Sequence, residues 1–151
     1  MTGDAPLNIH ATCVALAAGD AWHGVLLRGP SGAGKSDLAI RLVDGGARLV
    51  ADDRTELSVE AGQLVARPPK VLAGLVEARG LGVLRVPAEQ LLAAAPVVLI
   101  VDLVPAAEID RLPEPQSEAL LDISIPRIRL TAFDASTSAK IRLAVGTVRA
   151  T

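Results

Sequence analysis

The chain has 151 residues, half of them hydrophobic, and 15 Lys and Arg against 17 Asp and Glu give it a net charge of −2. This length suits one domain that buries a core, and the hydrophobic fraction excludes a disordered tail or linker. One Trp, one Phe and no Tyr leave no aromatic platform for single-stranded nucleic acid. The slight negative charge offers no basic surface for nucleic acid or for an anionic membrane. We therefore expect a single domain over residues 1–151 with neither kind of partner.

Targeting signals are absent from the pattern. A signal peptide requires Lys or Arg before its apolar stretch, and none precedes the apolar run over residues 11–18. The run over 97–104 is interrupted by Asp102 and is far shorter than the roughly 20 residues that cross a bilayer. Cys13 is the single cysteine, so it can form neither an internal disulfide nor a cysteine-based metal site. These features predict a protein of the reducing cytoplasm.

The first half of the chain predicts hairpins around one strand–loop–helix unit. In chain order we expect a strand over 9–17, a strand over 24–28, a helix over 36–43, a strand over 48–51 and a hairpin over 56–65. Gly19-Asp20 is typical of a turn, so the first two strands should pair antiparallel. The helix should stop at Gly45-Gly46, and Ala61-Gly62 should form the tip of the later hairpin.

The second half is poorer in helical signals. We expect a short helix over 71–78, a strand over 83–86, a weak helical turn over 88–94, a strand over 96–103, a strand over 120–130 broken at Pro126, and either a helix or a strand with a tail over 138–148. Together the two halves predict an α/β domain with a mixed sheet and few helices.

The strongest motif lies between the second strand and the first helix. Its eight residues fit G-x-x-x-x-G-K-[ST] in full, and they are Gly29, Pro30, Ser31, Gly32, Ala33, Gly34, Lys35 and Ser36. Glycines let backbone N–H groups turn inward around phosphate oxygens, and the helix N-terminus adds partial positive charge. Lys35 would reach the β- and γ-phosphates, and the Ser36 hydroxyl would ligate Mg²⁺. A nucleoside triphosphate site is predicted, with ATP or GTP left open.

Such a loop needs a carboxylate for the metal and often another for the nucleophile. Two candidates end apolar strands: Asp102 after residues 97–101, and the pair Asp52-Asp53 after residues 49–51. The pattern by itself favours neither candidate. Adjacent like charges repel unless a cation or distinct roles separate them, which makes the pair harder to dismiss as a turn.

Several segments resemble HPr kinase/phosphorylase, the bacterial enzyme family that acts on a serine of the phosphocarrier HPr. The similar segments are Arg48-Leu49-Val50-Ala51-Asp52-Asp53, Ile9-His10 before the phosphate-loop strand, Leu75-Val76-Glu77-Ala78-Arg79-Gly80-Leu81-Gly82-Val83, and Asp110-Arg111-Leu112. They occur in order over roughly residues 8–130, and the Glu77-to-Gly82 signature is far more specific than the phosphate loop. The implied fold is the phosphate-loop kinase domain of the HPr kinase and phosphoenolpyruvate carboxykinase type.

The resemblance also implies roles, and it favours Asp52-Asp53 over Asp102. Lys35 would bind phosphate, and Ser36 with Glu77 would hold the divalent metal. Asp53 would take the serine proton, with Asp52 beside it as a metal or water partner and His10 near the pair. Arg111 would stabilise charge on the transferring phosphoryl group. The implied reaction is ATP- and Mg²⁺-dependent phosphorylation of a serine on HPr or an HPr-like protein.

Two departures from the family pattern refine this expectation. The chain has no room for the family's N-terminal domain or its further C-terminal helices, so it resembles the catalytic domain alone. The family's "PVRPGR" loop, associated with the reverse reaction, aligns with residues 131–136, where both arginines are missing. Inorganic phosphate beside a phosphoserine needs cationic charge, so we expect weak or absent phosphorylase activity.

Two other functions stay open. One is a small-molecule kinase built on the same phosphate-loop core. The other is a nucleotide-dependent switch without turnover, although a switch needs no carboxylate to activate a nucleophile. The family forms hexamers and the chain is rich in Ala, Val and Leu, so a homo-oligomer, a trimer or hexamer, is expected.

Overall fold

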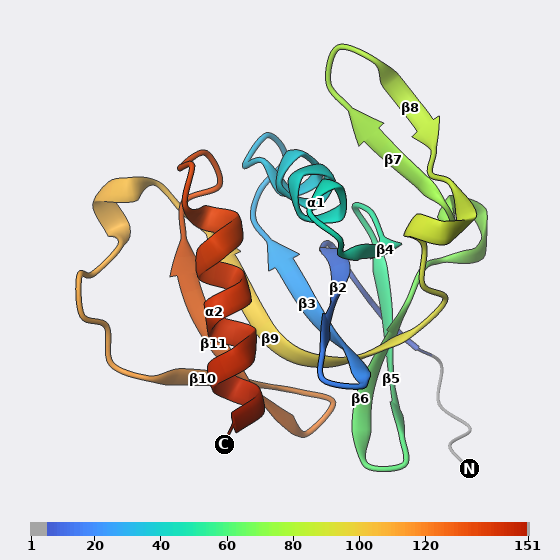
Figure 1. Ribbon diagram of the computed structural model, residues 1–151. Helices are drawn as coiled ribbons and strands as arrows, with labels where there is room; N and C mark the ends of the chain where they lie inside the picture. The colour runs from blue at the N-terminus through green and yellow to red at the C-terminus, as the bar shows by residue number, and fades with distance from the viewer. Residues whose placement is uncertain (1–5, 151) are drawn as a thin grey trace.

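A computed structural model describes residues 6–150 of the chain (Figure 1). Its strands are β1 (Leu7–Ile9), β2 (Thr12–Ala18), β3 (Ala21–Arg28), β4 (Arg48–Ala51), β5 (Thr55–Glu60), β6 (Gln63–Arg67), β7 (Leu75–Ala78), β8 (Gly82–Arg85), β9 (Ala95–Leu103), β10 (Gln116–Leu120) and β11 (Ile123–Leu130). Its helices are α1 (Lys35–Asp44) and α2 (Thr137–Ala150), with short 3₁₀ turns η1 (Lys70–Leu72), η2 (Ala88–Gln90) and η3 (Ala106–Glu108). None of these helices is both long and apolar enough to cross a bilayer.

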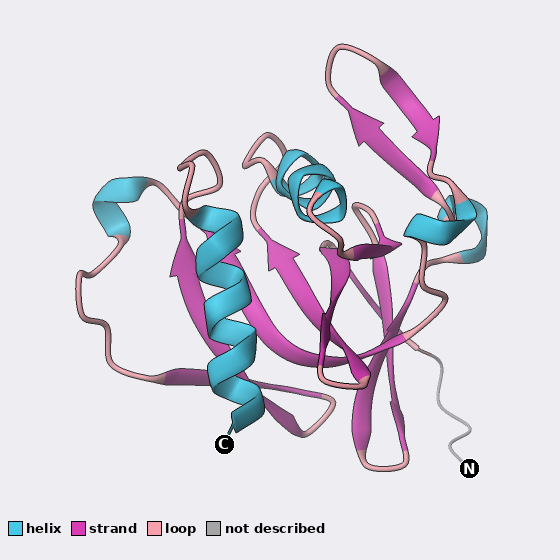
Figure 2. Cartoon of the chain, viewed as in Figure 1, coloured by secondary structure: helices cyan, strands magenta, loops and turns pink. Residues whose placement is uncertain are grey.

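Nine strands form one mixed sheet in the order β1-β5-β6-β9-β3-β2-β4, with β11 also pairing with β9 and β10 with β11. β9 runs parallel to β3 and β11, and its first residues pair antiparallel with β6. The start of β9 pairs with the β5–β6 hairpin and the rest of it pairs with β3 and β11, so this long curved strand joins the two parts of the sheet (Figure 2). β7 and β8 form a separate two-stranded hairpin beside α1. The predicted α/β class with a mixed sheet is confirmed.

The core has two parts, one on each face of β2, β3 and β9. On the face that α1 and α2 cover, Val25, Leu27 and Val101 pack with Leu38 of α1 and Ile141 of α2. On the opposite face, residues one position along in the same strands pack against the β5–β6 hairpin, as Leu26 and Ile100 do with Leu57 and Leu64. Because side chains alternate across a strand, this apolar filling of both faces fixes which way every polar residue at a strand end points.

Two expectations about elements are wrong. Residues 71–78 form no helix: after η1, Gly74 turns with a φ of 77°, and β7 pairs with β8. Burial alternates along β7, with Val76 and Ala78 inside, which is a strand period. The last sheet segment is a hairpin that turns at Leu121-Asp122, where both φ angles are positive, and not at Pro126. Pairing of β11 with β9 begins at Arg127, so the ring of Pro126 interrupts no bond to that neighbour.

The other predicted elements are confirmed within a few residues. The β2–β3 hairpin, α1 with its end at Gly45, β4, the β5–β6 hairpin around Ala61-Gly62, and β9 all form where expected. The C-terminal segment, left open between helix and strand, is the helix α2.

Candidate active site

The phosphate loop connects the buried end of β3 to α1. Ala33 N donates to Pro30 O at 3.0 Å, and Leu38 N to Gly34 O at 2.9 Å, so a tight turn leads directly into the helix. Gly34 caps the helix with a φ of 96°, a conformation that favours glycine. A Cβ at Gly34 would lie 2.7 Å from the Ala132 Cβ, so the loop after β11 also requires glycine here.

Lys35 is buried at the base of this loop, 6% exposed. Its Nζ donates to Gly29 O at 2.7 Å and to Pro30 O at 3.1 Å. Burial lowers the pKa of the Lys35 ammonium, and the nearby carboxylates of Asp53 and Asp52 oppose that shift. The ammonium therefore stands in a partly desolvated position, where an anionic ligand would stabilise its charge.

Asp52 joins four segments of the chain. Its Oδ1 accepts hydrogen bonds from Ser36 Oγ at 2.7 Å and Thr12 Oγ1 at 3.0 Å. Its Oδ2 accepts from the backbone N–H of Glu77 at 3.0 Å. Asp52 is 7% exposed, so these three donors replace the water that a free carboxylate would have. Asp52 thereby fixes the end of β4 to the phosphate-loop serine, to β2 and to β7.

Asp53 is the exposed member of the pair. It has a left-handed φ of 66°, which Asp tolerates better than most residues, and its N–H donates to Thr12 Oγ1 at 3.2 Å. Its side chain is 64% exposed, and its Oδ1 lies 2.9 Å from His10 Nε2. The two adjacent aspartates are thus separated by environment: Asp52 is turned into the fold, and Asp53 is turned toward solvent.

Glu77 lies on β7, and its backbone is tied to Asp52 while its side chain is exposed. Asp52 thus contacts both Ser36 and the backbone of Glu77, three residues whose side chains carry the oxygen ligands that Mg²⁺ prefers. Among the described residues, no three His, Cys, Asp or Glu side chains converge into a ready-made metal cluster. Mg²⁺ is commonly held by one or two protein oxygens plus substrate phosphates, which this donor set fits.

Asp102, the other candidate carboxylate, lies away from this site and is paired with an arginine. Arg28 Nε donates to its Oδ1 at 2.8 Å and Arg28 Nη2 to its Oδ2 at 3.1 Å. The neighbouring Val101 and Leu103 face the helices, so Asp102 points to the opposite face of the sheet. The phosphate loop contacts Asp52 through Ser36, and Asp102 is engaged in an ion pair on the other side.

The structure does not bring Arg111 to this group. Arg111 is exposed on the segment between η3 and β10, and no acidic side chain of the described residues forms a salt bridge with it. That segment runs beyond β11 from the phosphate loop, at the left edge of Figure 1. The remaining predicted residues, His10, Lys35, Ser36, Asp52, Asp53 and Glu77, lie together.

Thr12 also belongs to the site, although the sequence did not predict it. Thr12 is fully buried and connects both aspartates, donating to Asp52 and accepting from the Asp53 N–H. The usable signal was a lone hydroxyl in an otherwise apolar buried strand, because such a group must find a partner.

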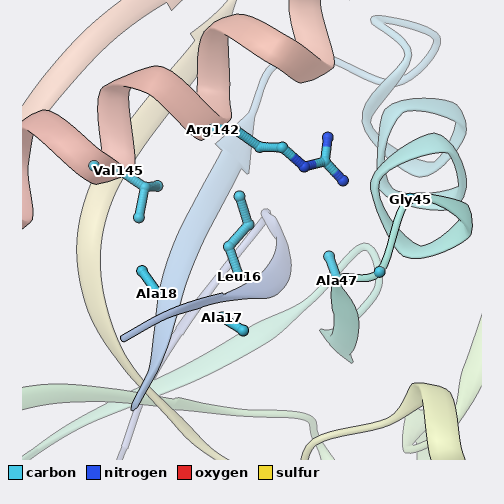
Figure 3. A pocket seen from close by; sticks show the side chains of 9 residues that line it. Leu16, Ala17, Ala18, Gly45, Ala47, Arg142 and Val145 are labelled. Carbon is cyan, nitrogen blue, oxygen red and sulfur yellow. The ribbon is translucent and has the colours of Figure 1, made fainter. Parts of the chain in front are cut away.

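A pocket of about 310 Å³ lies elsewhere, at the opposite end of α1 (Figure 3). Small residues and Leu16 line it, and Arg142 reaches across it from α2 to donate to Leu42 O at 3.2 Å. It holds no carboxylate and takes no part in the site described above.

A phosphate loop between a buried strand and a helix, with carboxylates at the end of a nearby strand, is the arrangement of an α/β phosphoryl-transfer domain. The chain belongs to the HPr serine kinase C-terminal domain family, whose model matches residues 7–148. The expected family membership is thereby confirmed.

Two relatives illustrate the likeness. The HPr kinase/phosphorylase of Clostridium beijerinckii (strain ATCC 51743 / NCIMB 8052) is 46% identical over 63 residues, which are 42% of this chain and 21% of that protein. The chain therefore spans about a fifth of that curated relative. The structure of the Hpr(Ser) kinase/phosphatase from Coxiella burnetii matches with a TM-score of 0.83 at 27% identity, over 95% of this chain and 90% of the other.

Proposed function

We propose that this domain is an ATP- and Mg²⁺-dependent kinase that phosphorylates a serine of HPr or of an HPr-like protein. Family membership supports the reaction class. The observation that carries the proposal is the bond from Ser36 to Asp52, because it places the acidic pair directly beside the phosphate loop. The proposed compartment is the cytoplasm, which agrees with a buried free thiol at Cys13.

The triphosphate would lie in the loop from Gly29 to Ser36. Lys35 now donates to two loop carbonyls, and a phosphate oxygen would offer its ammonium a stronger, charged partner. Ser36, with Glu77 and Asp52 at hand, would hold Mg²⁺, which supplies charge neutralisation at the phosphates when bound.

Asp53 is the better base of the pair because it is accessible. Its exposed carboxylate can reach the hydroxyl of a docked serine, whereas Asp52 is occupied by three donors. The serine proton passes to Asp53 as the serine oxygen bonds to the γ-phosphorus, and the bond from that phosphorus to the β–γ bridging oxygen breaks to release ADP. His10 contacts Oδ1 of Asp53, and within residues 6–150 no hydrogen bond is made to Oδ2, which can therefore take the proton.

The reverse reaction should be weak or absent. The segment 131–136, which carries no Arg or Lys, packs against Gly34 of the phosphate loop. Its backbone takes a hydrogen bond from Arg41 at Ala132 O, and that guanidinium is also paired with Asp37. A free cation for inorganic phosphate is therefore not supplied from this segment.

The proposed role of Arg111 has no support from the arrangement within this chain. Charge stabilisation by Arg111 remains a prediction of the family resemblance, and it requires the segment after η3 to meet a phosphate loop.

The test is phosphoryl transfer from γ-labelled ATP with Mg²⁺. The cognate HPr, HPr with the target serine changed to alanine, and a panel of small metabolites are compared as acceptors. Label on HPr alone, lost with the serine variant and with Lys35→Met in the kinase, supports the proposal. Label on a metabolite, or nucleotide binding without any transfer, would replace it by a small-molecule kinase or a switch. Phosphoserine-HPr with inorganic phosphate then tests the reverse direction.

A further inference from the structure

The chain's single phenylalanine sits exposed beside the phosphate loop. Phe133 lies between β11 and α2 and is 69% exposed, an unusual position for a large aromatic side chain. A Cβ built on Gly34 would lie 2.9 Å from the Phe133 Cζ and 3.1 Å from its Cε1. One edge of the ring thus rests on the phosphate loop while most of the side chain faces solvent.

The segment that carries Phe133 is held at both ends. Arg41 of α1 donates to Ala132 O, and Thr137 Oγ1 donates to Thr131 O at 2.6 Å. Thr137 N also donates to Asp134 O at 3.2 Å. These bonds hold the backbone of this segment in place before any ligand arrives, which lowers the entropy cost of using the Phe133 side chain as a contact.

Phe133 and the acidic pair flank the phosphate loop from opposite sides. In the sheet, β4 with Asp52 at its end lies two strands from β3 through β2. β11, which leads into residues 131–136, lies two strands from β3 in the other direction, through β9. Figure 1 shows the segment before α2 on the side of the phosphate loop away from β4.

This arrangement orients the nucleotide, given the function proposed above. If Asp53 receives the serine proton, the γ-phosphate points toward β4, and the nucleoside must leave the loop toward the other flank. We propose that Phe133 stacks on the nucleobase of the bound triphosphate. A phenyl ring reads the flat face of a base and no hydrogen-bonding edge, so it favours a purine without separating ATP from GTP.

The test compares ATP with inorganic tripolyphosphate, which has the phosphates but no base. Affinities are measured by calorimetry with Mg²⁺ for the wild type, Phe133→Ala and Leu143→Ala. Leu143 is the control because it is similarly exposed, at 72%, on α2. Phe133→Ala should weaken the affinity for ATP on the order of tenfold and leave the affinity for tripolyphosphate unchanged. Leu143→Ala should change the affinity for neither ligand.

A fluorescence readout gives a second, independent measure. Trp22 is the single tryptophan, so Trp22→Phe with Phe133→Trp places one reporter at the proposed stacking position. ATP and GTP should quench its emission, and tripolyphosphate should not. Quenching by tripolyphosphate as strong as that by the nucleotides, or no quenching by either nucleotide, would contradict stacking.

The outcomes separate this inference from the function on which it rests. Equal weakening of ATP and tripolyphosphate in Phe133→Ala would show that the ring only supports the loop, and no weakening would show that the base lies elsewhere. Either result overturns the stacking proposal and leaves the kinase intact. If the wild type binds neither ligand, or Lys35→Met binds both as tightly as the wild type, the phosphate site itself is wrong, and stacking falls with it.

Discussion

Two adjacent aspartates lie in different surroundings, and on this difference rest the separate roles proposed for them. Asp52 is buried and takes three hydrogen bonds, whereas Asp53 is exposed in a left-handed conformation beside His10. The sequence predicted the pair but could not assign the two members. Which one turns inward depends on Thr12 and on the Glu77 backbone, residues far from it in the chain.

Asp52→Ala should lower the free energy of unfolding by about 2–4 kcal/mol, since it removes a carboxylate that satisfies three donors. Asp52→Asn should also lower the free energy of unfolding, because its amide NH₂ would replace one carboxylate oxygen and face a group that donates a hydrogen bond there. Denaturant midpoints measure both effects. The control is Asp37→Asn, whose exposed pair with Arg41 is worth well under about 1 kcal/mol. Equal midpoints for Asp52→Ala and the control would contradict a structural role for Asp52.

At the level of elements, an ion network joins the strands next to the phosphate loop. Arg28, the last residue of β3, binds Asp102 of β9 and also Glu118 of β10, the latter at 2.7 and 2.8 Å. Arg127 of β11 lies 3.3 Å from Glu118 as well. The acid that the sequence offered as a metal ligand thus braces the strand that leads into the loop.

This network makes stability depend on pH. The Arg28 guanidinium holds the pKa of Glu118 below its ordinary value, so its contribution is full above the unfolded-state pKa. That contribution is lost as pH falls below about 4.5 toward the lower folded-state pKa. Arg28→Met should lower the free energy of unfolding by about 2 kcal/mol at pH 7 and flatten this acid dependence. Arg28→Lys cannot form both forked pairs, so its free energy of unfolding should lie between those of Arg28→Met and the wild type. Unfolding curves from pH 7 to pH 3 measure this, and parallel curves for Arg28→Met and wild type would contradict it.

Local signals account for the elements that the sequence predicted well. Helical spacing ended by Gly45-Gly46 gives α1, and Ala61-Gly62 between alternating residues gives the β5–β6 hairpin. Residues 71–78 failed because the same apolar residues fit a strand once Gly74 turns and β8 supplies a partner. The orientation of Asp102 and the closeness of 131–136 to Gly34 depend on strand order, which no local pattern encodes.

At the scale of the whole molecule, the β7–β8 hairpin exposes an apolar surface next to the site. Leu81 is 74% exposed and Val83 66%, and all four residues of β8 are open to solvent. An exposed apolar surface of this kind commonly marks an interface. We propose that a second copy of the chain covers it, in line with the expected trimer or hexamer.

Light scattering tests this assembly. The wild type should have a mass several times the 15.5 kDa of one chain. The double variant Leu81→Ser with Val83→Ser should have a smaller mass, because it removes apolar area from the interface. The same double change at Leu112 and Leu143, also exposed but on other elements, is the control. A monomeric wild type, or an unchanged mass in the hairpin variant, would contradict the proposal.

The division of roles between Asp52 and Asp53 is tested most directly by one transfer measurement. Single-turnover phosphorylation of HPr from ATP and Mg²⁺ is compared between the wild type and Asp53→Asn, with nucleotide affinity measured in parallel. Asparagine tolerates the left-handed φ of this position, so the fold and the phosphate loop should persist. We predict nucleotide affinity within about threefold of wild type and a transfer rate lower by about 10²–10⁴. Transfer by Asp53→Asn at a rate close to wild type would show that Asp53 is not the base.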